Sequence, residues 1–216
     1  MKGWLIVWQH RGMILHGLLT TFGISAIATA CAFLLAIALF TAGLRIQAAA
    51  RMITALIDLM RCVPFLLFLY LIYYGLPAWH IVLDPLVAGI TALTLYNAAY
   101  FAELLRAAWI QLPHEQIEAG HAFGYYGLRL LRRIILKPLI LIALPTLGNQ
   151  TIQIIKDSAF LVIITVEELT YSANELQATY YIPFASFLCA ALLYWALCLI
   201  VEFGVRASLR QAAFIR

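Results

Sequence analysis

The sequence predicts an all-α integral membrane protein, a single-domain bundle of five transmembrane helices. Of its 216 residues 65% are hydrophobic and only 11% are charged, whereas soluble domains usually carry roughly a quarter charged residues. Several stretches without Asp, Glu, Lys or Arg approach or exceed the ~20 apolar residues that a spanning helix needs. Helix is the expected element because lipid offers no partner to an unpaired backbone amide or carbonyl.

Five long apolar runs account for the expected bundle. The uncharged runs are Gly12–Leu44, Cys62–Leu83, Pro85–Ala102, Pro138–Ile155 and Leu176–Val201. Extended past isolated ionisable residues, they predict spans at approximately 14–42, 54–77, 85–106, 137–165 and 181–205. The first run is too long for the core of a signal peptide, so we expect it to be retained as a span.

Basic residues gather on one side of the expected bundle. The residues assigned to that side are Arg45, Arg51, Arg61, Arg106, Arg129, Arg132, Arg133, Lys137, Arg206, Arg210 and Arg216. The opposite side has only Lys2, Arg11 and Lys156. The positive-inside rule therefore predicts an extracytoplasmic N-terminus and a cytoplasmic C-terminus. This asymmetry and attraction to anionic membrane lipid explain the net charge of +4 without a nucleic-acid partner.

The cytoplasmic segment at approximately 111–136 is too long for a tight turn and should have structure of its own. Pro113 can begin a helix, and Glu115 and Glu118 favour its positive end. We expect a helix over 113–123, an exit at Gly124, and a second amphipathic stretch with Leu128, Leu131, Ile134 and Ile135 on its apolar side. On spacing alone, an interfacial anchor on lipid headgroups explains the segment equally well.

Within this segment the sequence resembles a known family. Glu118-Ala119, Gly124, Ile134 and Leu136, with Leu144-Pro145 beyond, look like the EAA loop of bacterial ABC-importer permeases. Further fragments are similar to polar amino acid permeases: Arg61-Cys-Val-Pro64, Tyr73-Tyr-Gly-Leu-Pro77, Ala99 to Arg106, Leu147-Gly-Asn149 and Lys156-Asp-Ser158. The resemblance covers roughly residues 14–210. Gly120 and Lys137 depart from the pattern, which usually has alanine and proline there, and Gly120 predicts a looser helix.

The resemblance implies an ABC type I importer permease with a cytoplasmic coupling helix between spans three and four. It implies ATPase-coupling roles for Gln116, Glu118, Ala119 and Gly124. The implied partners are an ATP-binding subunit dimer, a second permease subunit and an extracytoplasmic amino acid binding protein, in the bacterial inner membrane. No phosphate loop of the form Gly-x-x-x-x-Gly-Lys-Ser/Thr occurs. We therefore expect no enzyme activity and no cofactor on this chain, with ATP and Mg bound by the partner.

Polar residues inside the third and fourth expected spans mark a candidate translocation path. Ionisable groups at membrane depth usually face a protein interior or a water-filled cavity. The candidates for lining the path or contacting substrate are Tyr100, Glu103, Arg106, Asn149, Gln153 and Lys156. The alternative is a pair of structural ties, Glu103–Arg106 near the cytoplasmic edge and Lys156–Asp157 near the outer edge.

Arg61 and Pro64 are gate or hinge candidates at the start of the second span, because proline removes one amide donor from the helix. An ordinary snorkelling arginine is the alternative for Arg61. The five histidines and four cysteines show no metal-ligand spacing. We expect the cysteines to be unpaired.

Two functions of other classes remain as alternatives. An ion-coupled secondary transporter should show inverted repeats and interrupted helices, and the two halves show no convincing repeat. A non-transporting membrane scaffold, recruiting a cytoplasmic partner through the 111–137 loop, would tolerate apolar substitutions in the polar stripes of spans three and four.

Overall fold

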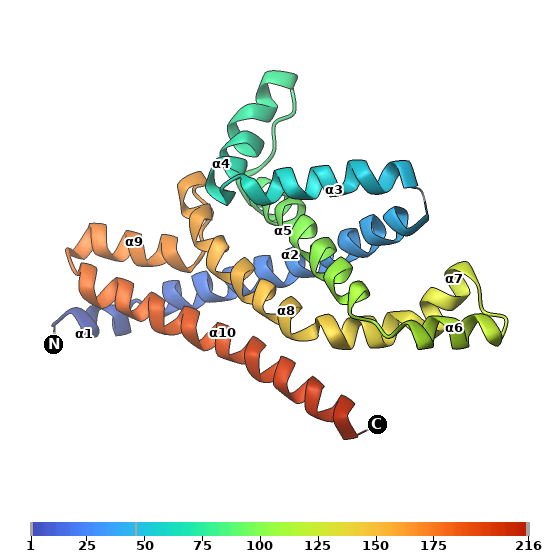
Figure 1. The fold of residues 1–216 in the computed structure, drawn as a ribbon. Coiled ribbons are helices and arrows are strands. Elements are labelled where there is room, and N and C mark those ends of the chain that lie inside the picture. Colours follow the sequence, from blue (N-terminus) through green and yellow to red (C-terminus); the bar gives the residue numbers. More distant parts are fainter. Residues whose placement is uncertain (1, 46, 215–216) are drawn as a thin grey trace.

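The computed structural model describes residues 2–45 and 47–214, and the regular elements in these ranges are all helical. In chain order they are α1 (Lys2–Gln9), α2 (Arg11–Arg45), α3 (Gln47–Cys62), α4 (Phe65–Tyr70), the short turns η1 (Leu71–Gly75) and η2 (Leu76–Trp79), α5 (Pro85–Ile110), α6 (His114–Ala122), α7 (Gly127–Leu130), η3 (Leu131–Ile135), α8 (Leu136–Asp157), η4 (Ser158–Ile164), α9 (Leu169–Tyr180) and α10 (Pro183–Phe214). Figure 1 shows the N-terminus, α1 and α9 at one end of the molecule and α6 and α7 at the other.

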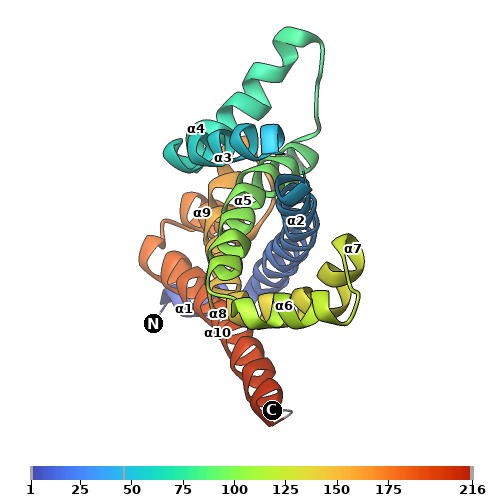
Figure 2. The same ribbon diagram turned by 45° about the vertical axis from the view of Figure 1, so that its right-hand side comes forward.

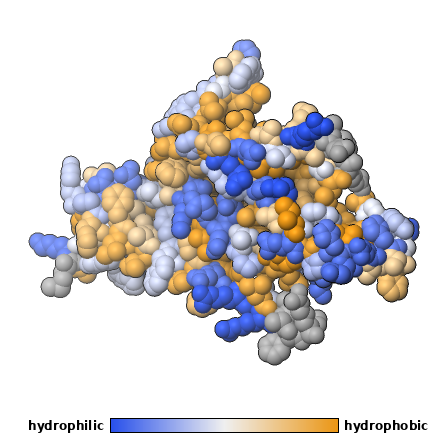
Figure 3. Space-filling model, viewed as in Figure 1, coloured by the Kyte–Doolittle hydropathy of each residue, from blue (hydrophilic) through white to orange (hydrophobic). Residues whose placement is uncertain are grey.

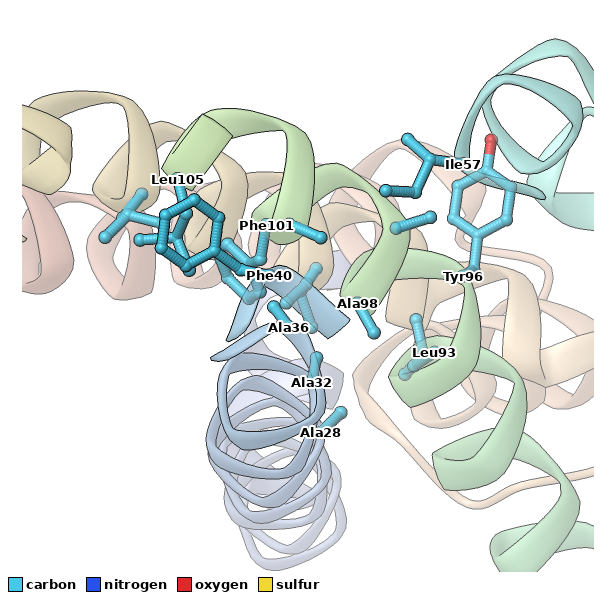
Figure 4. Packing of buried hydrophobic residues seen from close by; sticks show 14 of the residues in the cluster. Ala28, Ala32, Ala36, Phe40, Ile57, Leu93, Tyr96, Ala98, Phe101 and Leu105 are labelled. Atoms are coloured by element: carbon cyan, nitrogen blue, oxygen red, sulfur yellow. The ribbon is translucent and has the colours of Figure 1, made fainter. Parts of the chain in front are cut away.

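The core forms where α2 packs against α5. Ala28, Ala32 and Ala36 recur every four residues along α2, and all three are fully buried (Figure 4). Small residues at this spacing let two helix backbones approach closely, which is how helices associate where lipid gives no hydrophobic driving force. On the α5 side, Leu93 and Phe101 belong to the same buried cluster as these alanines.

Among the described residues, three helices are long and apolar enough to cross a membrane. They are α2 and α5, which contain the first and third expected spans, and α10, which covers the fifth except for its first two residues. The fourth expected span, 137–165, divides between α8 and η4, and α8 is not among the three. The mean hydropathy of α8 is lowered by its polar residues, which are Asn149, Gln150, Gln153, Lys156 and Asp157.

The second expected span, 54–77, is bent in the structure. The chain bends by 104° between the segments 50–62 and 65–79, and the two segments qualify as a candidate span only together. Pro64 supplies the physical reason, because its nitrogen cannot donate to the helical ladder. Beyond the bend, α4 packs against α5, and the chain that continues through η1 to η2 projects away from the other helices (Figures 1 and 2).

The α9 helix was not expected from the sequence. It packs against both α2 and α10, and Glu168, completely buried, caps its first turn. The Glu168 carboxylate accepts hydrogen bonds from the amides of Thr170 and Tyr171, both at 2.8 Å, and from the Tyr194 hydroxyl at 2.5 Å. This single side chain therefore ties α9 to α10.

Much of the surface is apolar, as a membrane-embedded chain requires. Figure 3 shows large hydrophobic areas interrupted by hydrophilic residues, among them residues towards the end of the molecule that carries α6. Exposed apolar side chains occur along each long helix, including Leu34 on α2, Leu95 on α5 and Trp195 on α10. Such side chains are stable next to lipid but would be a liability in water.

Candidate functional site

The loop between α5 and α8 folds as a short helix, a glycine turn and a second helix. Pro113 precedes α6 as its N-cap, and Glu115 lies in the first turn. Gly124 leaves the helix in the left-handed region, with a φ of 77°, while the Tyr125 amide donates to the Gly120 carbonyl at 3.0 Å. Glycine reaches this conformation at little steric cost, so Gly124 ends α6 as its C-terminal cap.

The residues assigned to coupling lie on or just after α6. Glu118, Ala119 and Gly124 are exposed, and Gln116 is partly exposed. Gly120 is instead buried against α7 and η3, where an added Cβ would collide with the Leu130 Cδ1. Gly120 therefore lets α6 lie close to the second helical stretch, a packing role that the sequence did not indicate.

The second stretch buries most of its expected apolar side. Leu131 and Ile135 are buried, and Ile134 packs against the core. Leu128 was wrongly placed with them, because it is 48% exposed. Leu128 lies in the first turn of α7, whereas Leu131, Ile134 and Ile135 all belong to the π-helical turn η3 that follows.

On α5, the polar stripe forms a connected cluster with the start of the second span. The Glu103 carboxylate accepts hydrogen bonds from Arg106 Nη2 and Nε, at 2.6 and 2.7 Å, and its Oε1 lies 3.8 Å from Arg61 Nη1. The Tyr100 and Tyr96 hydroxyls are 3.2 Å apart. The structure thus brings the path candidates of α5 together with the gate candidate Arg61, within about three helical turns along one side of α5.

On α8, the candidate path residues share an uncovered face. Asn149, Gln153 and Lys156 are all exposed, so within this chain they do not line an interior. The alternative Lys156–Asp157 tie is not among the ion pairs of the described residues, and the Asp157 carboxylate instead accepts from the Gln153 side-chain amide at 2.8 Å. Consecutive helical residues diverge by about 100°, whereas residues four apart lie on one side.

One buried polar contact between α5 and α8 was missed. The Gln150 side-chain amide donates to Asn97 Oδ1 at 2.7 Å, and Asn97 Nδ2 donates to the Leu93 carbonyl at 2.8 Å. Asn97 is completely buried. A lone asparagine within an apolar run was a usable signal, because polar side chains in membrane helices commonly hydrogen-bond across helices.

Metal and disulfide chemistry find no support in the part of the chain that the structure describes. It contains no group of three or more His, Cys, Asp or Glu that could hold a metal ion. The four cysteines, Cys31, Cys62, Cys189 and Cys198, are free.

Long apolar helices, a buried polar tie between α5 and α8, and a surface helix joined to the bundle through a glycine turn are typical of the membrane-embedded subunits of transport systems. A family model described as "Binding-protein-dependent transport system inner membrane component" matches residues 35–212. The chain belongs to this family. It is an inner-membrane permease subunit of an ABC transporter, without catalytic activity, and ATP hydrolysis resides on a separate subunit.

Similar proteins carry related names. The chain is 30% identical over 201 residues, 93% of each chain, to the probable glutamine ABC transporter permease protein GlnM of Bacillus subtilis (strain 168). It is 35% identical over 162 residues to the probable amino-acid ABC transporter permease protein PatM of Vibrio harveyi, covering 72% of this chain and 73% of PatM.

A solved structure described as an amino acid ABC transporter with histidines superimposes with a TM-score of 0.88 at 26% identity. The match covers 96% of this chain and 98% of that one. The all-helical fold is therefore that of ABC importer permeases. Family membership favours the importer over both alternatives, the ion-coupled transporter and the non-transporting scaffold.

Proposed function

We propose that this permease imports polar amino acids, and that its path runs along the polar faces of α5 and α8. The names of the two relatives given above refer to glutamine and to amino acids, which supports this substrate class. The observation that carries the proposal is the α8 face formed by Asn149, Gln153 and Lys156. It is polar, lies on a helix among membrane helices, and is left uncovered by this chain.

A polar face at membrane depth is costly against lipid, so it needs water or another protein chain beside it. We infer that a second permease subunit, identical or homologous, faces it and that the path lies between the two. Asn149 and Gln153 would offer amide groups, and Lys156 a positive charge, to the polar ends of an amino acid. Tyr100, Glu103 and Arg106 would line the path from α5, with Arg61 and Pro64 at its gate.

The proposed topology has five membrane segments: α2, the bent pair α3 and α4, α5, α8 and α10. The N-terminus would be extracytoplasmic and the C-terminus cytoplasmic, as the distribution of basic residues favours. α6 would then lie on the cytoplasmic side as the coupling helix. There an ATP-binding subunit dimer, which binds ATP and Mg, would contact Gln116, Glu118, Ala119 and Gly124, while a binding protein delivers the amino acid on the outer side.

The test compares two substitutions on α6 in proteoliposomes with the cognate ATPase and binding protein. Glu118→Lys reverses the charge at a proposed coupling position, and Glu115→Lys makes the same change one turn earlier, at another exposed position. We expect Glu118→Lys to abolish both amino acid uptake and substrate-stimulated ATP hydrolysis, and Glu115→Lys to retain most of both. Size-exclusion profiles of both variants serve as the folding control.

Two results would count against the proposal. Uptake that continues without any ATPase would indicate a secondary transporter. Equal loss in both variants would mean that the contact depends on the charge of the whole loop and not on the Glu118 position.

A second experiment tests the substrate class. Competition of labelled glutamine uptake by a panel of acidic, basic, neutral polar and apolar amino acids would define this class, and competition by apolar amino acids alone would refute a polar one.

A further inference from the structure

The bend at Pro64 leaves backbone carbonyls without helical partners. In an uninterrupted helix the carbonyls of Arg61 and Val63 would accept hydrogen bonds from the amides four residues later. The first backbone bond of α4 is instead donated by Phe68 to the Pro64 carbonyl. Carbonyls at a helix end need other partners, above all where lipid replaces water.

Two tyrosines of α5 supply those partners. The Tyr96 hydroxyl donates to the Val63 carbonyl at 2.9 Å, and the Tyr100 hydroxyl donates to the Arg61 carbonyl at 3.4 Å. Tyr96 and Tyr100 lie one helical turn apart, so their hydroxyls reach successive positions of the bend. Tyr96 is 8% exposed, which keeps water away from its hydrogen bond.

Ring packing holds the first of these tyrosines in place. Phe65 and Phe68 of α4 lie against the Tyr96 ring, with centroids 5.3 and 5.9 Å away. One turn further along α5 than Tyr100, Glu103 lies 3.8 Å from the Arg61 guanidinium, which also stands 5.9 Å from the centre of the Tyr100 ring. Both sides of the bend thus contact one stripe of α5. The α3 side does so through Arg61, and the α4 side mainly through its packing against Tyr96.

We propose that Tyr96 is a positioning residue that holds the α3–α4 bend against α5, so that movement of α5 in the transport cycle is passed to the bend at Pro64. Tyr96 acts through the Val63 carbonyl and does not contact substrate. The proposal rests on the transport cycle proposed above. It assigns to α5 a mechanical role in addition to lining the path.

A native reporter lies at the bend. Cys62 is exposed and adjoins both Arg61 and Val63. With Cys31, Cys189 and Cys198 replaced by serine, a membrane-permeant maleimide would report on Cys62 alone. The experiment compares the parent chain with Tyr96→Phe in the complex with its cognate ATPase, without nucleotide and with ATP and vanadate, and also measures amino acid imported per ATP hydrolysed.

Tyr96→Phe keeps the ring and removes the hydroxyl, which donates to the Val63 carbonyl at 2.9 Å and lies 3.2 Å from the Tyr100 hydroxyl. We expect the Cys62 labelling rate without nucleotide to change by about two- to tenfold, the effect on the bend equilibrium of losing the hydrogen bond to Val63. The difference in Cys62 labelling rate between the nucleotide-free state and the state with ATP and vanadate should shrink. Import per ATP should fall, while ATP hydrolysis persists.

Tyr74→Phe is the matched control. Tyr74 is 59% exposed beyond the bend, and its hydroxyl makes no hydrogen bond to the described residues. The proposal is overturned if Tyr96→Phe leaves both the labelling rates and the import-to-hydrolysis ratio at the values of Tyr74→Phe. A parent complex that imports no amino acid would count against the proposed function, while the labelling comparison would still decide the role of Tyr96.

Discussion

The close contact between α2 and α9 at Gly17 can be tested by a single methyl group. A Cβ at Gly17 would lie 2.9 Å from the Glu168 carbonyl oxygen and 3.0 Å from the Leu169 Cα. Both are backbone atoms next to the Glu168 cap, whose carboxylate is held by donors from α9 and α10. A shift of this backbone would disturb the hydrogen bond from Tyr194 of α10 to Glu168, so Gly17→Ala should strain the contact between α2 and α9.

The magnitude follows from a matched pair on one helix. Gly23 also lies on α2, and a Cβ there meets nothing within 4 Å. Both Gly→Ala changes gain about 0.5–1 kcal/mol of helix stability, so this gain cancels in their difference. The remainder is the overpacking cost at Gly17, about 1–3 kcal/mol, which corresponds to roughly 2–10 °C in melting temperature for a chain of this size.

The assay is thermal unfolding in detergent or lipid nanodiscs, followed by intrinsic fluorescence of the five tryptophans. We expect Gly17→Ala to melt below the wild type and Gly23→Ala to melt at or above it. Equal melting temperatures for the two variants, or a more stable Gly17→Ala, would refute the reasoning. Such a result would mean that α9 is free to shift against α2.

Two further predictions use the same assay. Gln150→Leu should destabilise the protein by about 1–3 kcal/mol, because it leaves the buried Asn97 oxygen unpaired, whereas Asn149→Leu at the adjacent exposed position should cost less; equal losses would contradict the α5–α8 tie. Gly120→Ala should change stability by less than about 1 kcal/mol, because the added methyl meets the far end of a flexible leucine side chain. A loss above about 3 kcal/mol would mean that this leucine cannot move.

Local contacts of the site were predictable from sequence spacing. The Glu103–Arg106 pair follows from a separation of three residues on a helix. The helix expected over 113–123 is present as α6, and Gly124 ends it, since both depend on a few neighbouring residues. The cysteines are expected to be unpaired because they fall in or beside apolar runs, where thiols behave as small hydrophobes.

Other features were beyond local spacing. Glu168 is completely buried, and its donors come from α9 and from Tyr194 far along the chain, which no local pattern indicates. The hydrogen-bond partner of the Val63 carbonyl at the bend is Tyr96, which lies more than thirty residues later. Neither partner can be identified without knowing which helices are neighbours.

The helical, membrane-embedded character of the chain and its family resemblance follow from the sequence alone, because apolar length and ordered motifs are properties of continuous segments. The three-dimensional arrangement was needed to show how sharply the second expected span bends, that Gly120 serves close packing, and that the described residues leave the polar face of α8 uncovered. Each of these depends on which side chain of a distant helix fills, or fails to fill, the space beside a residue. Helical periodicity gives the direction in which a side chain points, but not what it meets there.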